Sequence, residues 1–190
     1  MTHDPRRDIM RVFVVTATAR EIRLGLIICD LDGTLISSYM DTPNRRYNDW
    51  HVLPGRAETL AALQEQGHRV AIATNQAGVA FGHVTESQAK RKIAAALVAL
   101  GLPDDTPVAV CFAHPQAKSY RYRNRVELGR RKPSGAMLRE LMDATGEHED
   151  VVYVGDRPED RQAARDARVA FRWADDFFQR IDQPDLAPTP

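Results

Sequence analysis

The sequence contains few cysteines and no long apolar run. Two cysteines occur among 190 residues, Cys29 and Cys111, and their spacing excludes a disulfide framework and a four-cysteine zinc site. No segment approaches the roughly 20 consecutive apolar residues of a membrane-spanning helix. The first residues lack the long apolar segment of a signal peptide. We therefore expect a protein of the cytoplasm, a reducing compartment, with no membrane partner.

An excess of charge of either sign is also missing. The 26 basic side chains balance 26 acidic ones, so the formal net charge is zero. This balance argues against a protein built wholly around nucleic acid or acidic membranes, which require net positive charge, but it leaves a local basic patch open. A chain of this length forms one domain. It buries roughly 70% of its unfolded surface and needs no disulfide or metal to fold.

Apolar runs and helical stripes alternate along the chain. Strands are predicted at residues 24–30, 69–74, 108–112, 151–154 and 169–171. Helices are predicted after Gly55, after Thr85, after Ser134 and from Pro158, with Gly146 ending the third. Thr85 to Gln88 matches a capping box. Strands that alternate with helices predict an α/β domain with a doubly wound parallel sheet.

Polar side chains follow the ends of the predicted strands. Ligands of doubly wound sheets bind at this edge. The residues concerned are Asp30 and Asp32 in DLDGTL, Thr74 and Asn75 after the second strand, Lys132 in RRKPSG, and Asp156 and Asp160 in VGDRPED. Two carboxylates two residues apart and a third from another strand suit Mg²⁺, which prefers oxygen ligands. A hydroxyl and an ammonium nearby suit the other oxygens of a phosphate.

These motifs, in this order, resemble those of the haloacid dehalogenase (HAD) phosphatase superfamily from residue 24 to about residue 178. A single strand-end Asp is often only a turn or capping residue, but four motifs in order favour a catalytic site. The resemblance implies a Rossmann-like fold and a Mg²⁺-dependent phosphomonoesterase. Residues 23–182 are then the hydrolase domain. Residues 1–22 are an N-terminal extension, and the β-like run at 12–16 predicts an edge strand or a hairpin partner within it. The proline-rich residues 183–190 are expected to form a loose tail.

The resemblance also implies roles for single residues. Asp30 is the nucleophile that becomes an aspartyl phosphate, and Asp32 is the general acid and then the base. Mg²⁺ is held by Asp30, the Asp32 backbone carbonyl and Asp156. Thr74 and Lys132 are implied to stabilise the phosphoryl oxygens, and Asn75 is expected to bind the phosphate beside them. Asp160 is implied to orient the ligands of the metal. A cation and donors are needed because a carboxylate attacks an anionic phosphate poorly.

The spacing of the motifs leaves no room for a large cap domain. Asp32 and Thr74 are 42 positions apart, and Thr74 and Lys132 are 58 apart. The segments TNQAGVAFG, AHP and RRKPSGAML are similar to the capless branch that includes heptose-bisphosphate phosphatases, histidinol-phosphate phosphatases and polynucleotide 3′-phosphatase domains. DLDGTLI and Asp49-Trp50 look closer to the polynucleotide group.

The zinc loop of the heptose and histidinol enzymes is largely missing. Cys111 fills its first position, but Ala113, Leu128 and Arg130 replace the other three ligands. His114 could still pair with Cys111, but two ligands do not make a closed zinc site. We therefore expect no structural zinc.

A basic segment occupies residues 118–132 instead, with seven basic residues and one acidic residue. In an extended arm its arginines would line one face and its tyrosines the other. Arg121 and Arg123 would then hold a nucleic-acid backbone or a second phosphate of a metabolite. Alternatively, the segment is a solvated hairpin. Arg157 and Arg161 are expected on a solvated helix face.

Three functions stay open from the sequence. The first is a phosphatase acting on a small phosphorylated metabolite such as a sugar bisphosphate, which the neutral charge favours. The second is a 3′-phosphatase acting on nucleic-acid ends, which the basic segment favours. The third is a phosphate-binding regulatory protein without turnover. A monomer and a weak homodimer are both compatible with the length of the chain.

Overall fold

A sheet of five parallel strands forms the centre of the fold. The computed structural model describes residues 25–41 and 46–181. The strands are β1 (Leu26–Cys29), β2 (Arg69–Asn75), β3 (Val108–Cys111), β4 (Val151–Gly155) and β5 (Ala170–Trp173). Their order is β3-β2-β1-β4-β5, and every neighbouring pair is parallel. The predicted doubly wound α/β fold is therefore confirmed, with each strand end within two residues of its expected place.

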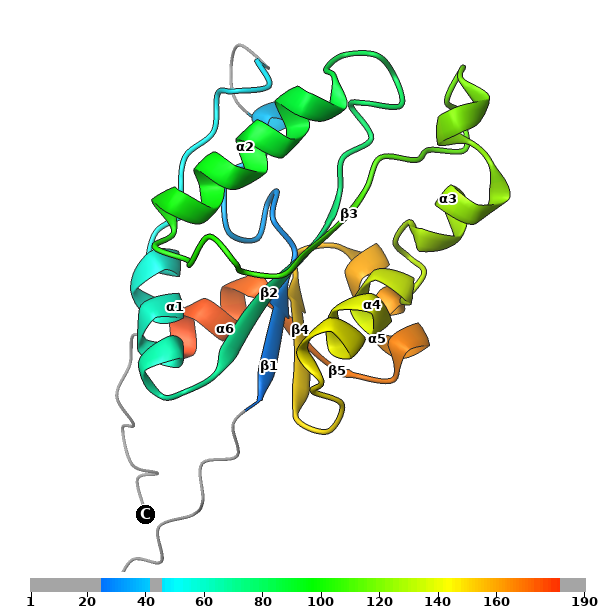
Figure 1. The fold of residues 1–190 in the computed structure, drawn as a ribbon. Coiled ribbons are helices and arrows are strands. Elements are labelled where there is room, and N and C mark those ends of the chain that lie inside the picture. The colour runs from blue at the N-terminus through cyan, green and yellow to red at the C-terminus, as the bar shows by residue number, and fades with distance from the viewer. Residues whose placement is uncertain (1–24, 42–45, 182–190) are drawn as a thin grey trace, which may run out of the picture.

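Helices cover both faces of this sheet (Figure 1). One face packs against α1 (Arg56–Glu65), α2 (Glu86–Ala99) and α6 (Ala174–Ile181), and the other against α4 (Ala136–Thr145) and α5 (Pro158–Ala167). β1 contributes Ile27 and Cys29 to one core and Leu26 and Ile28 to the other, because successive strand side chains point to opposite faces.

The predicted helix ends are mostly confirmed. Thr85 Oγ1 accepts a hydrogen bond from the Gln88 amide, and Gln88 Oε1 accepts one from the Thr85 amide, which completes the capping box of α2. Gly146 ends α4 in the left-handed conformation. The prediction that Ser134 caps α4 was wrong by one position: the capping residue is Gly135, and Ser134 Oγ accepts only a 3.3 Å hydrogen bond from the Ala136 amide.

The basic segment 118–132 is helical, so the predicted extended arm or hairpin is wrong. It forms the 3₁₀ turn η2 (Tyr120–Tyr122) and the helix α3 (Arg125–Arg130). Asn124 begins α3, because its side chain accepts hydrogen bonds from the amides of Val126 and Glu127. In a helical segment the alternating arginines and tyrosines do not separate onto two faces.

The connections between strands hold no large cap in the part of the chain that the structure describes. The 3₁₀ turn η1 (Tyr39–Asp41) and α1 are the helical elements between β1 and β2, and α2 is the one between β2 and β3. Among the described helices, none is both long and apolar enough to span a membrane. The strand expected at residues 12–16 and the tail expected at 183–190 lie outside the described residues. The expectation of no structural zinc stays a prediction.

The strand order places the change of direction between β1 and β4. From β1 the chain continues to β2 and β3 on one side, and it then crosses back to β4 and β5 on the other. Connections that depart to opposite sides leave a crevice beyond the carboxyl ends of the two central strands. Asp30 and Asp156, which follow β1 and β4, lie at this point.

Gly135, at the start of α4, lies so close to α5 that a larger side chain does not fit there. A methyl group at this position would lie 2.5 Å from the Ala167 amide nitrogen and 2.8 Å from the Ala163 carbonyl oxygen. We expect Gly135→Ala to lower the free energy of unfolding by about 1–3 kcal/mol, because backbone atoms cannot move aside easily. Gly129→Ala is the control, since open space surrounds Gly129 in α3. Urea unfolding should show no loss for the control, and equal stabilities would contradict the predicted clash.

Candidate active site

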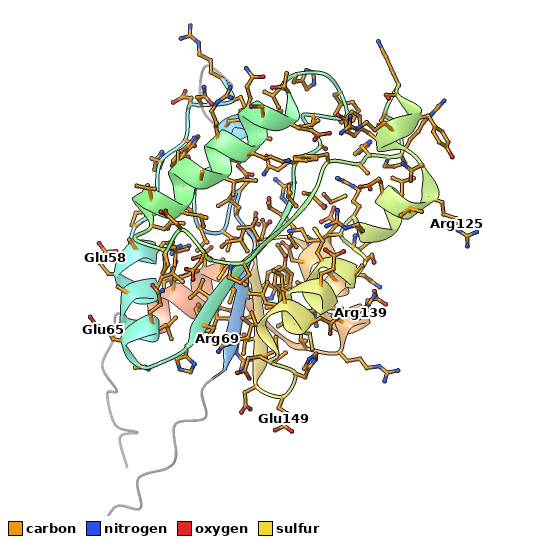
Figure 2. The ribbon with its side chains drawn as sticks, in the orientation of Figure 1. Glu58, Glu65, Arg69, Arg125, Arg139 and Glu149 are labelled. Carbon is orange, nitrogen blue, oxygen red and sulfur yellow. The ribbon has the colours of Figure 1, made fainter. Side chains whose placement is uncertain are left out.

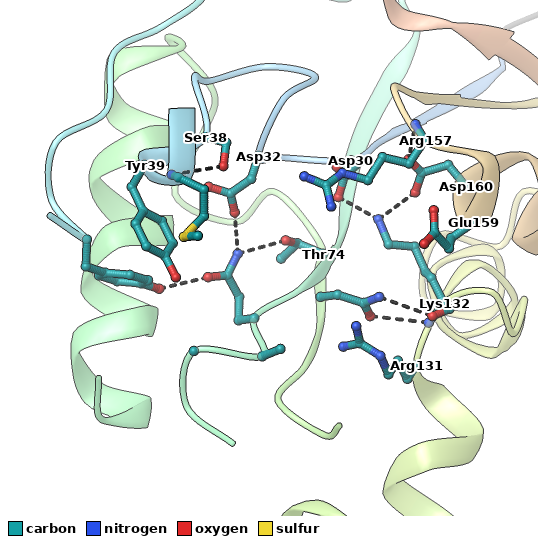
Figure 3. A pocket seen from close by; sticks show the side chains of 16 residues that line it. Asp30, Asp32, Ser38, Tyr39, Thr74, Arg131, Lys132, Arg157, Glu159 and Asp160 are labelled. Atoms are coloured by element: carbon teal, nitrogen blue, oxygen red, sulfur yellow. Dashed lines mark hydrogen bonds and ion pairs between the residues drawn. The ribbon is translucent and has the colours of Figure 1, made fainter. Parts of the chain in front are cut away.

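A cavity of about 200 Å³ opens beyond the carboxyl ends of β1, β2 and β4 (Figure 3). Six residues predicted from the sequence line it: Asp30, Asp32, Thr74, Asn75, Lys132 and Asp160. Asp30 and Lys132 lie on one side of this pocket, and Asp32 and Thr74 lie on the other. The fold thus brings together side chains that are up to 130 positions apart in the sequence.

Lys132 is the buried cation of this pocket. Its Nζ lies 2.5 Å from Asp30 Oδ1 and 2.7 Å from Asp160 Oδ1. It also donates to the Tyr153 hydroxyl at 2.9 Å and to the Ala73 carbonyl oxygen at 3.1 Å. Because Lys132 and both carboxylates are buried, water does not screen these interactions strongly. The ammonium therefore fixes the orientation of Asp30 and Asp160 together.

Burial changes how readily these groups ionise. It raises the pKa of Asp30 to about 7, an effect that the Lys132 ammonium opposes and the Asp160 carboxylate reinforces. Burial also raises the pKa of Asp156, again reinforced by Asp160. Burial alone would lower the pKa of Lys132, but Asp30 and Asp160 together raise it above its usual value. The three carboxylates Asp30, Asp156 and Asp160 therefore outnumber the single Lys132 ammonium among them, which leaves this cluster with an excess of negative charge.

Three carboxylates in this cluster are close enough to share a cation. Oxygen atoms of Asp30, Asp156 and Asp160 lie within 4.8 Å of one another. Gly33 has a φ of 91°, and a methyl group there would lie 2.4 Å from Asp156 Oδ2, so glycine lets the loop after β1 approach this carboxylate. Thr34 Oγ1 orients it by donating to Asp156 Oδ1 at 3.1 Å. Clustered oxygen ligands and missing positive charge fit Mg²⁺.

The three carboxylates are not equivalent in this cluster. Asp160 Oδ1 accepts hydrogen bonds from Tyr153 and Lys132, and Asp160 Oδ2 accepts one from the Arg157 amide. Protein donors therefore contact both of its oxygens, which agrees with the orienting role expected for it. The Asp32 carboxylate is not part of the cluster, because it is turned towards Gln76 and Lys92. The metal role expected for Asp32 concerned its backbone carbonyl.

The two predicted polar residues at the end of β2 have different surroundings. Thr74 is fully buried, and its Oγ1 accepts a 2.9 Å hydrogen bond from Gln76 Nε2, which leaves its own proton for another acceptor. The Asn75 side chain instead binds the backbone of Lys132, with its Nδ2 donating to the carbonyl oxygen and its Oδ1 accepting from the amide, both at 3.2 Å. Asn75 therefore holds the Lys132 segment in place.

The arginines of the pocket are not those predicted. Arg121 and Arg123 are not among the residues that line it, and Arg121 binds Glu86 of α2 at 2.7 Å. Arg131 and Arg157 line it instead. Arg157 is exposed, as expected, with 59% of its side chain accessible, and its Nε also lies 3.6 Å from Asp156 Oδ2. Adjacency to Lys132 and Asp156 was the available signal for these two arginines.

Further residues of the site were missed by the motif analysis. Gln76, Lys92 and Tyr153 bind the predicted residues through their side chains, and the Tyr47 hydroxyl donates to Gln76. Lys92 gave a signal that could have been used, because it lies within the apolar stripe of its helix. A cation at a buried helix position requires a partner, although the pattern does not tell which one.

Comparison with known proteins agrees with this geometry. Residues 25–182 match the family model described as polynucleotide kinase 3 phosphatase. The chain is 32% identical to a D-glycero-beta-D-manno-heptose-1,7-bisphosphate 7-phosphatase of Pseudomonas putida, over 74% of this chain and 77% of the relative.

Solved structures show the same fold. The D,D-heptose 1,7-bisphosphate phosphatase of B. bronchiseptica, solved with magnesium and phosphate, has a TM-score of 0.60 and 28% identity, covering 78% of this chain and 79% of that one. A HAD-like phosphatase candidate from Mesorhizobium loti has a TM-score of 0.64 and 21% identity, covering 86% and 90%. The match of the family model over most of the described chain, together with these relatives, shows that the chain is a phosphatase that belongs to the polynucleotide kinase 3 phosphatase family of the HAD superfamily.

Proposed function

We propose that the chain is a Mg²⁺-dependent phosphomonoesterase that acts through an aspartyl phosphate on Asp30, with a small phosphorylated metabolite such as a sugar bisphosphate as its substrate. The observation that carries this proposal is the position of Asp30 at the floor of an open pocket, held by Lys132 and next to Asp156 and Asp160. The substrate class is supported by the Pseudomonas putida relative, which is named for a heptose bisphosphate.

The two proposed steps use the aspartates on the two sides of the pocket. An Asp30 oxygen forms a bond to phosphorus while the bond to the leaving oxygen breaks, and Asp32 gives its proton to that oxygen. Water then attacks phosphorus and gives its proton to Asp32. The bond between Asp30 and phosphorus breaks, which releases inorganic phosphate and restores both carboxyl groups. The Lys132 ammonium and the Thr74 hydroxyl donate to the phosphoryl oxygens.

Asp30 and Asp156 would hold Mg²⁺ together with the Asp32 backbone carbonyl, and Asp160 would orient this shell. When bound, the ion supplies positive charge between the anionic phosphate and the attacking carboxylate. The protein residues provide the rest: Lys132 fixes the direction of Asp30, and Thr34 fixes that of Asp156.

Arg131 and Arg157 support a substrate with a second anionic group. Both line the pocket, on the side of Lys132, and Arg131 is half-buried. We expect Arg131→Met to lower kcat/KM for a sugar bisphosphate by about 10- to 100-fold, the usual effect of losing hydrogen bonds to a charged group. The corresponding monophosphate should lose much less. Arg125→Met is the control, since Arg125 is exposed on α3 away from the pocket (Figure 2). Equal losses for both substrates would contradict a second anion site at Arg131.

A nucleic-acid end with a 3′-phosphate is the second candidate substrate. The description of the family model and the basic segment 118–132 favour it. The segment is anchored to the start of α2, because Arg121 and the Tyr122 hydroxyl both bind Glu86. Arginines and tyrosines presented there would contact a backbone and stack on a base.

Phosphate release distinguishes these functions. Sugar monophosphates, sugar bisphosphates and a 3′-phosphorylated oligonucleotide are compared with Mg²⁺ and with a chelator. We expect the highest kcat/KM for a sugar bisphosphate and loss of activity with the chelator. Higher kcat/KM for the oligonucleotide, falling steeply with salt, would instead favour the nucleic-acid enzyme. No release from any substrate by the folded protein would contradict the proposal and favour a regulatory protein.

A further inference from the structure

Lys92 of α2 is a second buried lysine beside the active site. Its side chain has no solvent exposure, and its Nζ forms an ion pair with Asp32 Oδ1. The rings of Tyr39 and Tyr47 lie against this ammonium, with 5.7 Å and 4.8 Å from Nζ to the ring centroids. Aromatic faces attract a cation, so the rings stabilise the charge at this position. Each aspartate of DLDGTL therefore has its own buried lysine: Lys132 for Asp30 and Lys92 for Asp32.

The other oxygen of Asp32 is held as well. Gln76 Nε2 donates to Asp32 Oδ2 at 2.6 Å, and Gln76 Oε1 accepts from the Tyr47 hydroxyl at 2.8 Å. The same Nε2 lies 2.9 Å from Thr74 Oγ1, which connects Asp32 to the end of β2. With Lys92 on one oxygen and Gln76 on the other, the carboxylate has one defined orientation on its side of the pocket (Figure 3).

A purely structural role accounts poorly for this lysine. Removing an ammonium from water is costly, and an apolar side chain of similar size often stabilises a buried position as well or better. The neighbouring residues of the same helix face are apolar: Ala89, Ile93 and Ala96. Lys92 is also absent from the residues that line the pocket, so it does not reach the substrate directly. Its ion pair with Asp32 is its direct link to the reacting groups.

We propose that Lys92 is the positioning residue of the acid–base group Asp32, which it holds towards the leaving oxygen and whose negative charge it stabilises once the proton has been given up. This inference rests on the proposed function. In the first step the proton moves from Asp32 to the leaving oxygen, and in the second a proton from water returns to Asp32. Lys92 keeps its own proton in both steps, because its task is to hold the carboxylate.

The test compares two aryl phosphates with different leaving groups. p-Nitrophenolate leaves without a proton, whereas phenolate is more basic and depends more on the general acid. We expect Lys92→Met to lower kcat/KM for phenyl phosphate at least about tenfold more than for p-nitrophenyl phosphate, because general acid–base catalysis contributes about 10²–10⁴-fold. Slower hydrolysis of the aspartyl phosphate should also produce a burst of p-nitrophenol before the steady state.

Lys90→Met is the matched control, since Lys90 is exposed on the same helix and should leave the ratio of the two kcat/KM values unchanged. Thermal melting shows whether each variant folds, and Lys92→Gln replaces Lys92→Met if the latter does not. Equal losses for both substrates without a burst would overturn the role of Lys92. Full activity of Asp30→Asn would instead overturn the proposed function, so the two failures are distinguishable.

Discussion

Replacing Asp30 by Asn is expected to reduce phosphate release by at least about 10³-fold, because loss of a nucleophile removes a covalent step that the remaining groups cannot replace. The amide has nearly the same shape as the carboxyl group but does not attack phosphorus. Lys132 keeps its contact with Asp160 in this variant, so the site retains a partner for its buried ammonium. Release of phosphate from p-nitrophenyl phosphate in the presence of Mg²⁺ measures the effect.

Two controls separate loss of the nucleophile from loss of the fold. The burial that raises the pKa of Asp30 to about 7 makes its charge unfavourable in the folded protein, so the neutral amide should leave the melting temperature largely unchanged. Asp32→Asn should behave differently, because Asp30 can still attack a substrate with a good leaving group while hydrolysis of the aspartyl phosphate is slow. An Asp30→Asn protein that retains wild-type turnover would exclude Asp30 as the nucleophile.

The fold and the ends of its strands could be predicted from local patterns. A buried parallel strand is a short apolar run, and its last residue marks the edge at which ligands bind. Asp30 and Asp156 each follow such a run directly, and Thr74 lies at the end of one, so their convergence follows from the topology alone. Lys132 does not follow a strand, and its place in the site was implied by the resemblance to the HAD superfamily.

The contacts that orient these groups could not be predicted in the same way. Lys92 and Asp32 are 60 positions apart, and Gln76 and Asp32 are 44 apart, so their pairing depends on how α2 packs over the loops. The prediction for the basic segment 118–132 was wrong for a different reason. Its alternation of arginine and tyrosine suggested an extended arm, but the Asn124 cap provides local hydrogen bonds that favour a helix.

Replacing Lys132 by Met is expected to have the second large effect, on both stability and activity. The variant leaves the buried carboxylates of Asp30 and Asp160 without the ammonium that lies 2.5 Å and 2.7 Å from them. Breaking a buried ion pair on one side costs about 3–5 kcal/mol, which corresponds to roughly 10 °C in melting temperature for a chain of this size. Lys118→Met, an exposed position at the start of the same segment, should melt like the wild type.

Mg²⁺ should restore part of the stability that Lys132→Met loses. The acidic cluster has one positive charge fewer in the variant, so a cation bound among Asp30, Asp156 and Asp160 compensates more repulsion than it does in the wild type. A ligand that binds only the folded state stabilises it in proportion to its affinity. The rise in melting temperature on adding Mg²⁺ should therefore be larger for Lys132→Met than for the wild type.

Phosphate release by Lys132→Met should stay low even with Mg²⁺, because the donor that directs Asp30 and contacts the phosphoryl oxygens is missing. Equal Mg²⁺ responses in the two proteins would contradict a shared site for the cation and the Lys132 ammonium.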